Sequence, residues 1–131
     1  APLPAAPIDG KDIRPLLLGT PGAKSPWDAT GFAYYRMEQL QAVRAGSWKL
    51  YLPLEKKITT NARKTTPAKA ALYDVRSDVH EDHEVSAQFP EVVRRLMTLA
   101  ADIRTEIGDA DQPGKGQRPA GLVTNPRALR P

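Results

Sequence analysis

Apolar and polar side chains alternate along the middle of the chain, which predicts β-strands there. Residues 32–37 are rich in aromatic, β-favouring side chains, and alternation continues over residues 40–44 and 48–52. A short turn around Gly46 separates the last two stretches, because glycine takes the positive φ that a tight turn needs. The pattern therefore predicts a β-hairpin that the aromatic strand before it extends into a meander.

The alternation also assigns the side chains of each strand to one of the two faces of the sheet. In the second strand it places Leu40, Ala42 and Arg44 on one face and Gln41 and Val43 on the other. Since only one face of such a sheet packs on other elements of the fold, this assignment predicts which residues enter the core.

A helix over residues 90–107 is the clearest single element of the chain. Its apolar residues recur at steps of four, three, four and four, at Val92, Leu96, Leu99, Ile103 and Ile107. Pro90 suits the first helical position and Gly108 suits the C-cap. A further strand is predicted over residues 71–75, and the sheet is the local surface that can bury the helix. We therefore expect an α+β fold: a small four-stranded antiparallel sheet packed against one C-terminal helix, with extended irregular arms.

Proline, glycine and polar residues dominate both ends of the chain. We expect residues 1–31 to form an irregular arm, residues 32–108 the sheet-and-helix subdomain, and residues 109–131 a Gly/Pro/Arg-rich tail. Within the arm, residues 11–19 predict a short helical turn and residues 20–31 a loop. Arms of this length usually lie on a partner, so the sequence predicts that something else covers them.

The amino-acid composition excludes several kinds of site and structure from this chain. The chain has 131 residues, enough for one domain, and a net charge of +4. It contains no cysteine, which excludes disulfides, thiolate metal sites and a cysteine nucleophile within these residues. No apolar run approaches the roughly 20 residues of a membrane-spanning helix, so we expect no membrane span.

Much of the positive charge lies in residues 55–70, which are predicted to form a long exposed loop. This segment is rich in lysine and arginine and contains no aromatic residue. Surfaces that bind single-stranded nucleic acid combine basic residues with aromatic platforms, so we expect no nucleic-acid partner. A polyanion such as a sulfated glycan remains compatible with the loop.

The tip between the first two strands carries the candidate binding residues Tyr35, Arg36 and Gln39. Arg36 is the best candidate for binding an anion, because its planar guanidinium matches a sulfate or a carboxylate. His80 and His83 have the i, i+3 spacing that would suit two metal ligands on a helix, but their stretch is predicted to be a turn. We expect them to face solvent and to bind no metal.

Four segments occur in an order that resembles a known family. They are "IDGKDIRPLLLG", "FAYYRMEQLQAVRAGSWKLYL", "ALYDVRSDVHEDHEVSAQFPEVVRRL" and "GDADQPGKGQRP". Together they resemble the C-terminal subdomain of formylglycine-dependent sulfatases of the arylsulfatase A and N-acetylgalactosamine-6-sulfatase type. The resemblance covers residues 3 to about 123. It implies a small antiparallel sheet with a helix, docked on a larger catalytic domain.

The resemblance also implies where the chemistry lies. In this family a Cys/Ser-x-Pro-x-Arg motif supplies the formylglycine nucleophile, and Ca²⁺ or another divalent cation binds in the N-terminal domain. That motif does not occur in this sequence. We therefore expect no catalytic residue, metal ligand or cofactor in this chain, and residues 1–31 would link it to a missing catalytic domain. The resemblance further implies a periplasmic, secreted or lysosomal location.

Two interpretations of function stay open at this stage. In the first, the chain is the C-terminal portion of a sulfatase, a sulfuric ester hydrolase, with a structural and pocket-rim role. Its partner would be the catalytic domain, in the same polypeptide or a companion chain, and the parent would act on a sulfate ester. In the second, the chain is an independent basic β-rich module that binds sulfated glycans or other polyanions. A free-standing enzyme is the weakest interpretation, because no nucleophile–base pair is evident.

Overall fold

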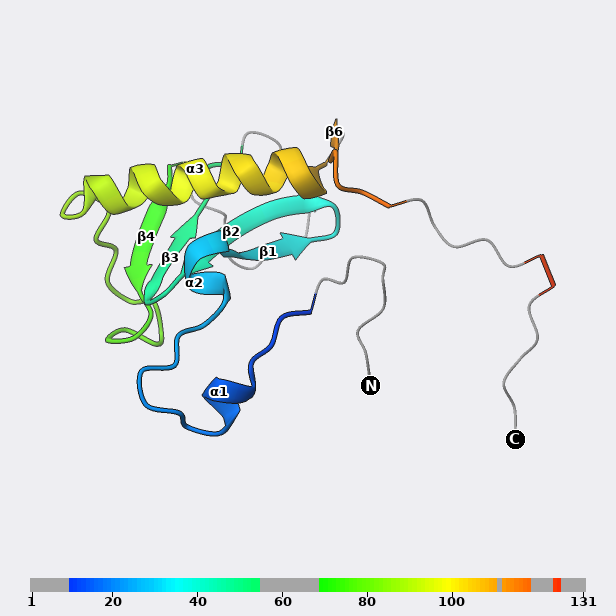
Figure 1. Cartoon of the computed structure of the whole chain (residues 1–131). Helices are drawn as coiled ribbons and strands as arrows, with labels where there is room; N and C mark the ends of the chain where they lie inside the picture. The colour runs from blue at the N-terminus through cyan, green and yellow to red at the C-terminus, as the bar shows by residue number, and fades with distance from the viewer. Residues whose placement is uncertain (1–9, 55–68, 111, 119–123, 126–131) are drawn as a thin grey trace.

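The computed structural model describes residues 10–54, 69–110, 112–118 and 124–125. Its centre is a four-stranded antiparallel sheet in the order β1 (Phe32–Arg36), β2 (Gln39–Ala45), β3 (Trp48–Tyr51) and β4 (Ala71–Asp74). The helix α3 (Pro90–Ile107) lies across one face of this sheet, as Figure 1 shows. The predicted α+β fold, with four antiparallel strands and one covering helix, is confirmed.

A β-bulge interrupts the pairing of β1 with β2. Tyr34 pairs with Ala42, whereas Tyr35 pairs with Leu40, so that Gln41 is one extra residue in β2. An extra residue of this kind restarts the alternation of side chains with the opposite phase.

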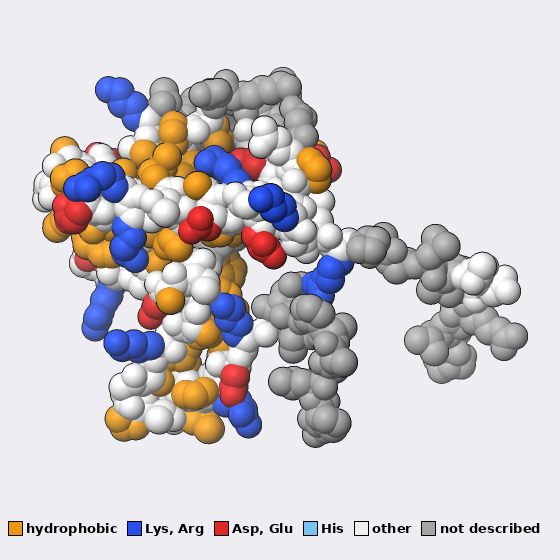
Figure 2. Space-filling view, turned by 45° about the horizontal axis from the view of Figure 1, so that its top comes forward, with side chains coloured by type: hydrophobic (Ala, Val, Ile, Leu, Met, Phe, Trp, Pro, Cys, Tyr) orange, Lys and Arg blue, Asp and Glu red, His pale blue; other side chains and the backbone are white. Residues whose placement is uncertain are grey.

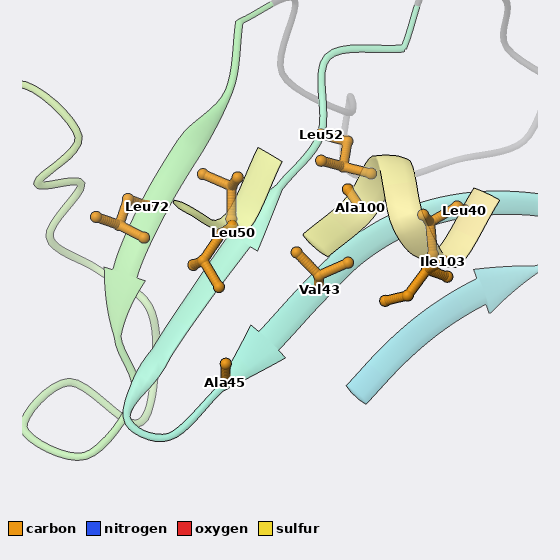
Figure 3. Packing of buried hydrophobic residues seen from close by; sticks show 9 residues of the cluster. Leu40, Val43, Ala45, Leu50, Leu52, Leu72, Ala100 and Ile103 are labelled. Atoms are coloured by element: carbon orange, nitrogen blue, oxygen red, sulfur yellow. The ribbon is translucent and has the colours of Figure 1, made fainter. Parts of the chain in front are cut away.

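The bulge changes which residues of β2 reach the core. Leu40 and Val43 both point towards α3, and Figure 3 shows them beneath the helix. Ala42 is buried on the other side of the sheet, where it pairs with Tyr51 of β3. The predicted faces of the second strand, with Leu40 beside Ala42 and opposite Val43, are therefore wrong. A strict period of two holds only for a strand without a bulge.

The core lies between the sheet and α3 and is aliphatic. Its buried residues are Leu40, Val43, Ala45, Leu50, Leu52 and Leu72 from the sheet side and Leu96, Ala100 and Ile103 from α3. Leu96 and Ile103 belong to the predicted stripe, whereas Ala100 lies beside it and is more deeply buried than Leu99, which is half-buried. Ile107, the last residue of that stripe, lies at the end of α3 and is 48 % exposed. Burying each large side chain contributes about 1.5–3 kcal/mol.

Aromatic rings and a charge pair occupy the opposite side of the sheet. We call Tyr34, Lys49, Tyr51 and Tyr73, together with Glu81 from the turn after β4, the aromatic face. The Nζ of Lys49 donates hydrogen bonds to Glu81 Oε1 at 2.6 Å and to the hydroxyl of Tyr51 at 2.9 Å. The same Nζ lies 4.9 Å from the ring centre of Tyr34 and 4.6 Å from that of Tyr51, within cation–π range.

Two short helices precede the sheet. The turn predicted over residues 11–19 is present as α1 (Arg14–Leu17). The loop predicted over residues 20–31 contains a second helix, α2 (Trp27–Thr30), which ends at Gly31 with φ of 74° and packs against β2. The loop prediction is wrong at this point, because four residues are too few to show a helical period in the sequence.

Two tiny strands follow α3. They are β5 (Gly108–Asp109) and β6 (Gln112–Pro113), and they pair in antiparallel fashion. The tail was predicted without regular structure, so this ladder is a correction at its first residues. Within the described part of the chain, none of the helices combines the length and apolarity that crossing a bilayer requires.

Candidate functional site at the hairpin tip

The three predicted binding residues flank the tip of the hairpin formed by β1 and β2. Arg36 pairs with Gln39, and Met37 and Glu38 form the connection between them. Met37 adopts a left-handed φ of 54°, which closes the tight turn. Arg36 is exposed, Tyr35 is half-buried, and Gln39 is only 8 % exposed. Of the three, Arg36 is the side chain that the fold leaves most accessible to a ligand.

Tyr35 joins the hairpin to the end of the helix. Its hydroxyl donates a hydrogen bond of 2.6 Å to the backbone oxygen of Gly108. Burial raises the pKa of the Tyr35 phenol, and the nearby Asp109 carboxylate raises it further. The phenol therefore remains a protonated donor at neutral pH, and its hydroxyl is engaged in holding the fold together.

Asp109 is a site residue that the sequence did not single out. Its Oδ1 accepts a hydrogen bond of 2.9 Å from the backbone N–H of Leu40, at the start of β2. Its Oδ2 accepts one of 2.6 Å from Nε of Arg104, in the last turn of α3. The next residue, Ala110, donates its N–H to the backbone oxygen of Glu38 at 2.7 Å. The tip is thus fastened to the end of α3 through side-chain and backbone bonds.

The chain returns over the C-terminus of α3 and satisfies its last carbonyl groups. A helix normally leaves its final four backbone oxygens without intrahelical partners. Here each accepts a donor: Gly108 N to Arg104 O, Lys115 N to Thr105 O, Gly116 N to Glu106 O and Gln117 Nε2 to Ile107 O. We call residues 114–117 the helix clamp. A Cβ at Gly114 would overlap backbone atoms of Glu106 and Ile107, whereas one at Gly116 would mainly meet the side-chain carboxylate of Glu106.

A hollow of about 430 Å³ lies between the tip, the end of α3 and β6. Its polar lining comes from Tyr35, Glu38, Asp109, Gln112 and Gln117. Carboxylates and amides of this kind suit hydroxyl or cationic groups better than a sulfate. Arg36 is not part of this lining, so the hollow is a different surface from the predicted anion-binding side chain.

His80 and His83 lie apart from the tip and are both exposed. The Nδ1 of His83 is 3.7 Å from Oδ2 of Asp78. Backbone N–H groups of His83 and Asp82 donate to Asp78 and hold the pKa of its carboxyl below the usual value. Across the described ranges, no three His, Asp or Glu side chains gather in a way that would hold a metal ion.

One family of known proteins matches most of this chain. A protein-family model described as the C-terminal region of aryl-sulfatase matches residues 28–123, from α2 into the tail. A comparison with curated protein sequences gives no match.

A solved structure gives a second, independent likeness. It is a 6S-sulfatase from work on the metabolism of multiple glycosaminoglycans by Bacteroides thetaiotaomicron. The likeness has a TM-score of 0.60 and 26 % sequence identity over 80 % of this chain. It spans 22 % of that sulfatase, so this chain corresponds to a minor part of it. On the family match over most of its length, the chain belongs to the aryl-sulfatase C-terminal region family.

Proposed function

We propose that this chain works as the C-terminal part of a sulfatase and packs beside a catalytic domain that carries the nucleophile. The observation that carries the proposal is the family match over residues 28–123. The likeness to a 6S-sulfatase, of which the chain corresponds to 22 %, supports a larger catalytic part elsewhere. We call the polypeptide or complex that unites the two parts the parent protein.

The formylglycine and the Ca²⁺, or another divalent cation, of such a parent do not fit the residues described here. The sequence has no cysteine and no Cys/Ser-x-Pro-x-Arg motif. The described side chains form no group of three potential metal ligands. We therefore assign the formylglycine and the divalent cation to the catalytic domain. The role of this chain is to support that domain and to form part of the rim around the sulfate-ester pocket.

Within the rim, Arg36 is the residue that contacts the sulfate ester. Its exposed guanidinium stands at a tip whose backbone is fixed to α3 through Asp109 and Tyr35. A fixed tip limits the entropy lost when a side chain closes on an anion. Tyr35 and Gln39 act as supports of the tip, because the Tyr35 hydroxyl is bonded to Gly108 and Gln39 is buried.

The first test is intact mass spectrometry of the protein from its natural source, with an aryl-sulfate hydrolysis assay on the same sample. We expect the 131 residues to occur within, or bound to, a larger polypeptide that hydrolyses the ester. In that parent, Arg36→Ala should raise KM about tenfold, the loss expected for one charge-assisted hydrogen bond. Arg95→Ala, an exposed arginine on α3, is the matched control and should leave KM unchanged.

Two results would contradict parts of this proposal separately. If Arg36→Ala and Arg95→Ala behave alike in an active parent, the rim role fails while the family role stands. If the chain exists alone, folded and without hydrolytic activity, the sulfatase role itself fails. The alternative of a polyanion-binding module would then be tested by heparin affinity. Most of the basic loop on which that alternative depends lies outside the described residues.

A further inference from the structure

The helix α1 presents apolar side chains to solvent. None of its residues is buried, and Leu16, Leu17 and Leu18 are 40 %, 74 % and 81 % exposed. In Figure 1 it lies at the far end of a loop, away from the sheet and α3. Figure 2 shows hydrophobic side chains gathered at the tip of the lobe below the main body. Three consecutive exposed leucines form an unusual surface for a soluble protein and indicate a contact site.

We call residues 13–18, which include α1, the leucine turn. Local hydrogen bonds, rather than packing in a core, hold its conformation. Leu17 donates its N–H to the oxygen of Ile13 at 3.1 Å, and Leu18 donates to Arg14 at 2.9 Å. A salt bridge of 2.7 Å joins Arg14 to Asp12 just before the helix. Helices this short do not persist in water through intrinsic propensity alone. The turn is therefore expected to gain its stability from a surface that buries the leucines.

The leucine turn is also fastened to the subdomain. Nζ of Lys11 donates a hydrogen bond of 3.0 Å to Oγ1 of Thr30, the last residue of α2. Because α2 packs on β2, this bond ties the base of the arm to the sheet. The base of the arm therefore contacts the subdomain at the end of α2.

The position of the leucine turn in the sequence indicates which partner covers it. The family match describes a C-terminal region and begins at residue 28, so the rest of a sulfatase chain would lie on the N-terminal side of this point. The leucine turn also precedes residue 28 in the sequence. A second copy of this chain is a weaker candidate, because a stable dimer buries about 800 Å² on each partner, far more than one helical turn supplies.

We propose that Leu16, Leu17 and Leu18 insert into an apolar groove of the sulfatase catalytic domain and dock the subdomain on it. This inference rests on the proposed function and adds the contact surface. Leu17 and Leu18 form the centre of the contact, because they are the most exposed of the three. Their burial supplies the apolar core that the interface needs.

The test compares the same substitutions in two settings, the parent protein and the isolated 131-residue chain. The double variant Leu17→Ser/Leu18→Ser should lower the thermal midpoint of the parent by several degrees, because it places hydroxyls in a buried groove. It should leave the midpoint of the isolated chain unchanged, because the two side chains are exposed there. Val79→Ser is the matched control, since Val79 is 75 % exposed and lies in the turn after β4, outside α1. It should change neither midpoint.

Hydrogen exchange supplies a second readout that needs no variant. The amides of Leu17 and Leu18 should exchange at least about tenfold more slowly in the parent than in the isolated chain. Equal exchange rates in the two settings, or an equal shift of both midpoints, would overturn the docking role. If the parent hydrolyses sulfate esters and its leucine amides are unprotected, the inference alone fails. If no larger parent exists, the inference fails together with the proposed function.

Discussion

On the side of the sheet that α3 covers, the buried side chains are aliphatic, whereas on the other side tyrosine rings surround an ion pair. Leu50 and its neighbours on the first side are fully buried beneath the helix. Lys49 and Glu81 on the second side retain 16 % and 21 % of their side-chain exposure. One strand, β3, contributes to both, because its successive residues point to opposite faces.

The two faces stabilise the fold through different kinds of interaction. Hydrophobic burial is non-directional and proportional to area, so the helix side owes its stability to the amount of packed surface. The aromatic face depends on directional bonds to the Lys49 ammonium group. Burial by itself would lower the pKa of Lys49, but its hydrogen bonds with Glu81 and Tyr51 outweigh that effect and raise it. The helix side therefore supplies most of the stability, whereas the directional bonds of the aromatic face fix how its side chains are arranged.

The largest expected effect comes from truncating the helix side. Leu50→Ala should lower the free energy of unfolding by about 2–5 kcal/mol, since it removes a fully buried side chain and leaves a cavity. Tyr51→Phe, at the adjacent position on the aromatic face, should cost about 1 kcal/mol for the loss of its hydrogen bonds to Lys49 and Glu81. Urea denaturation of both variants measures the difference. Equal losses would show that the two faces contribute alike.

A smaller effect is expected where the helix is held at its end. Gly114→Ala should destabilise the chain by about 1–3 kcal/mol, because the new methyl group would overlap backbone atoms of Glu106 and Ile107. Gly10→Ala is the control, because nothing lies within 4 Å of the Cβ position there. Thermal unfolding followed by circular dichroism compares the two. A neutral Gly114→Ala would mean that the helix side does not depend on the clamp.

The smallest effect is expected on the aromatic face and is best seen at alkaline pH. The folded pKa of Lys49 is raised above 10.5, and burial followed by the bond to Glu81 raises that of Tyr51 above 10.0. Both groups hold their protons more tightly in the folded chain, so their contribution is present below these values and lost as pH rises through the folded pKa values. Glu81→Gln should cost about 1 kcal/mol at neutral pH and make the alkaline loss shallower. Midpoints measured between pH 8 and pH 11.5 provide the check, and an unchanged alkaline slope in the variant would contradict it.

Periodicity in the sequence predicted the main elements of the fold, because each is long enough to repeat its pattern. The helix over residues 90–107 and the four strands lie where apolar residues recur at the helical or strand period. The phase of β2 was not predictable in this way. Whether Gln41 is an extra residue depends on how β2 pairs with β1, and that pairing is a tertiary property.

The candidate site was only partly predictable for a related reason. The position of Arg36, Tyr35 and Gln39 at a hairpin tip follows from the strands, and the tip is present. The bond from Tyr35 to Gly108 joins residues 73 positions apart, so no local pattern announces it. Asp109 and the helix clamp fall in an aperiodic segment. Their one sequence signal is the cluster of Gly108, Gly114 and Gly116, which marks close backbone approach. The role of Arg36 at a sulfate-ester pocket stays a prediction.

The helix clamp also determines how the chain would carry a mechanical load. Residues 114–117 are bonded to the last turn of α3, so the chain leaves the helix folded back on it rather than along its axis. A force applied beyond residue 118 would therefore act first on these bonds at the end of the helix. Any segment attached there would emerge beside the hairpin tip, and its attachment would yield at the clamp before the core opened.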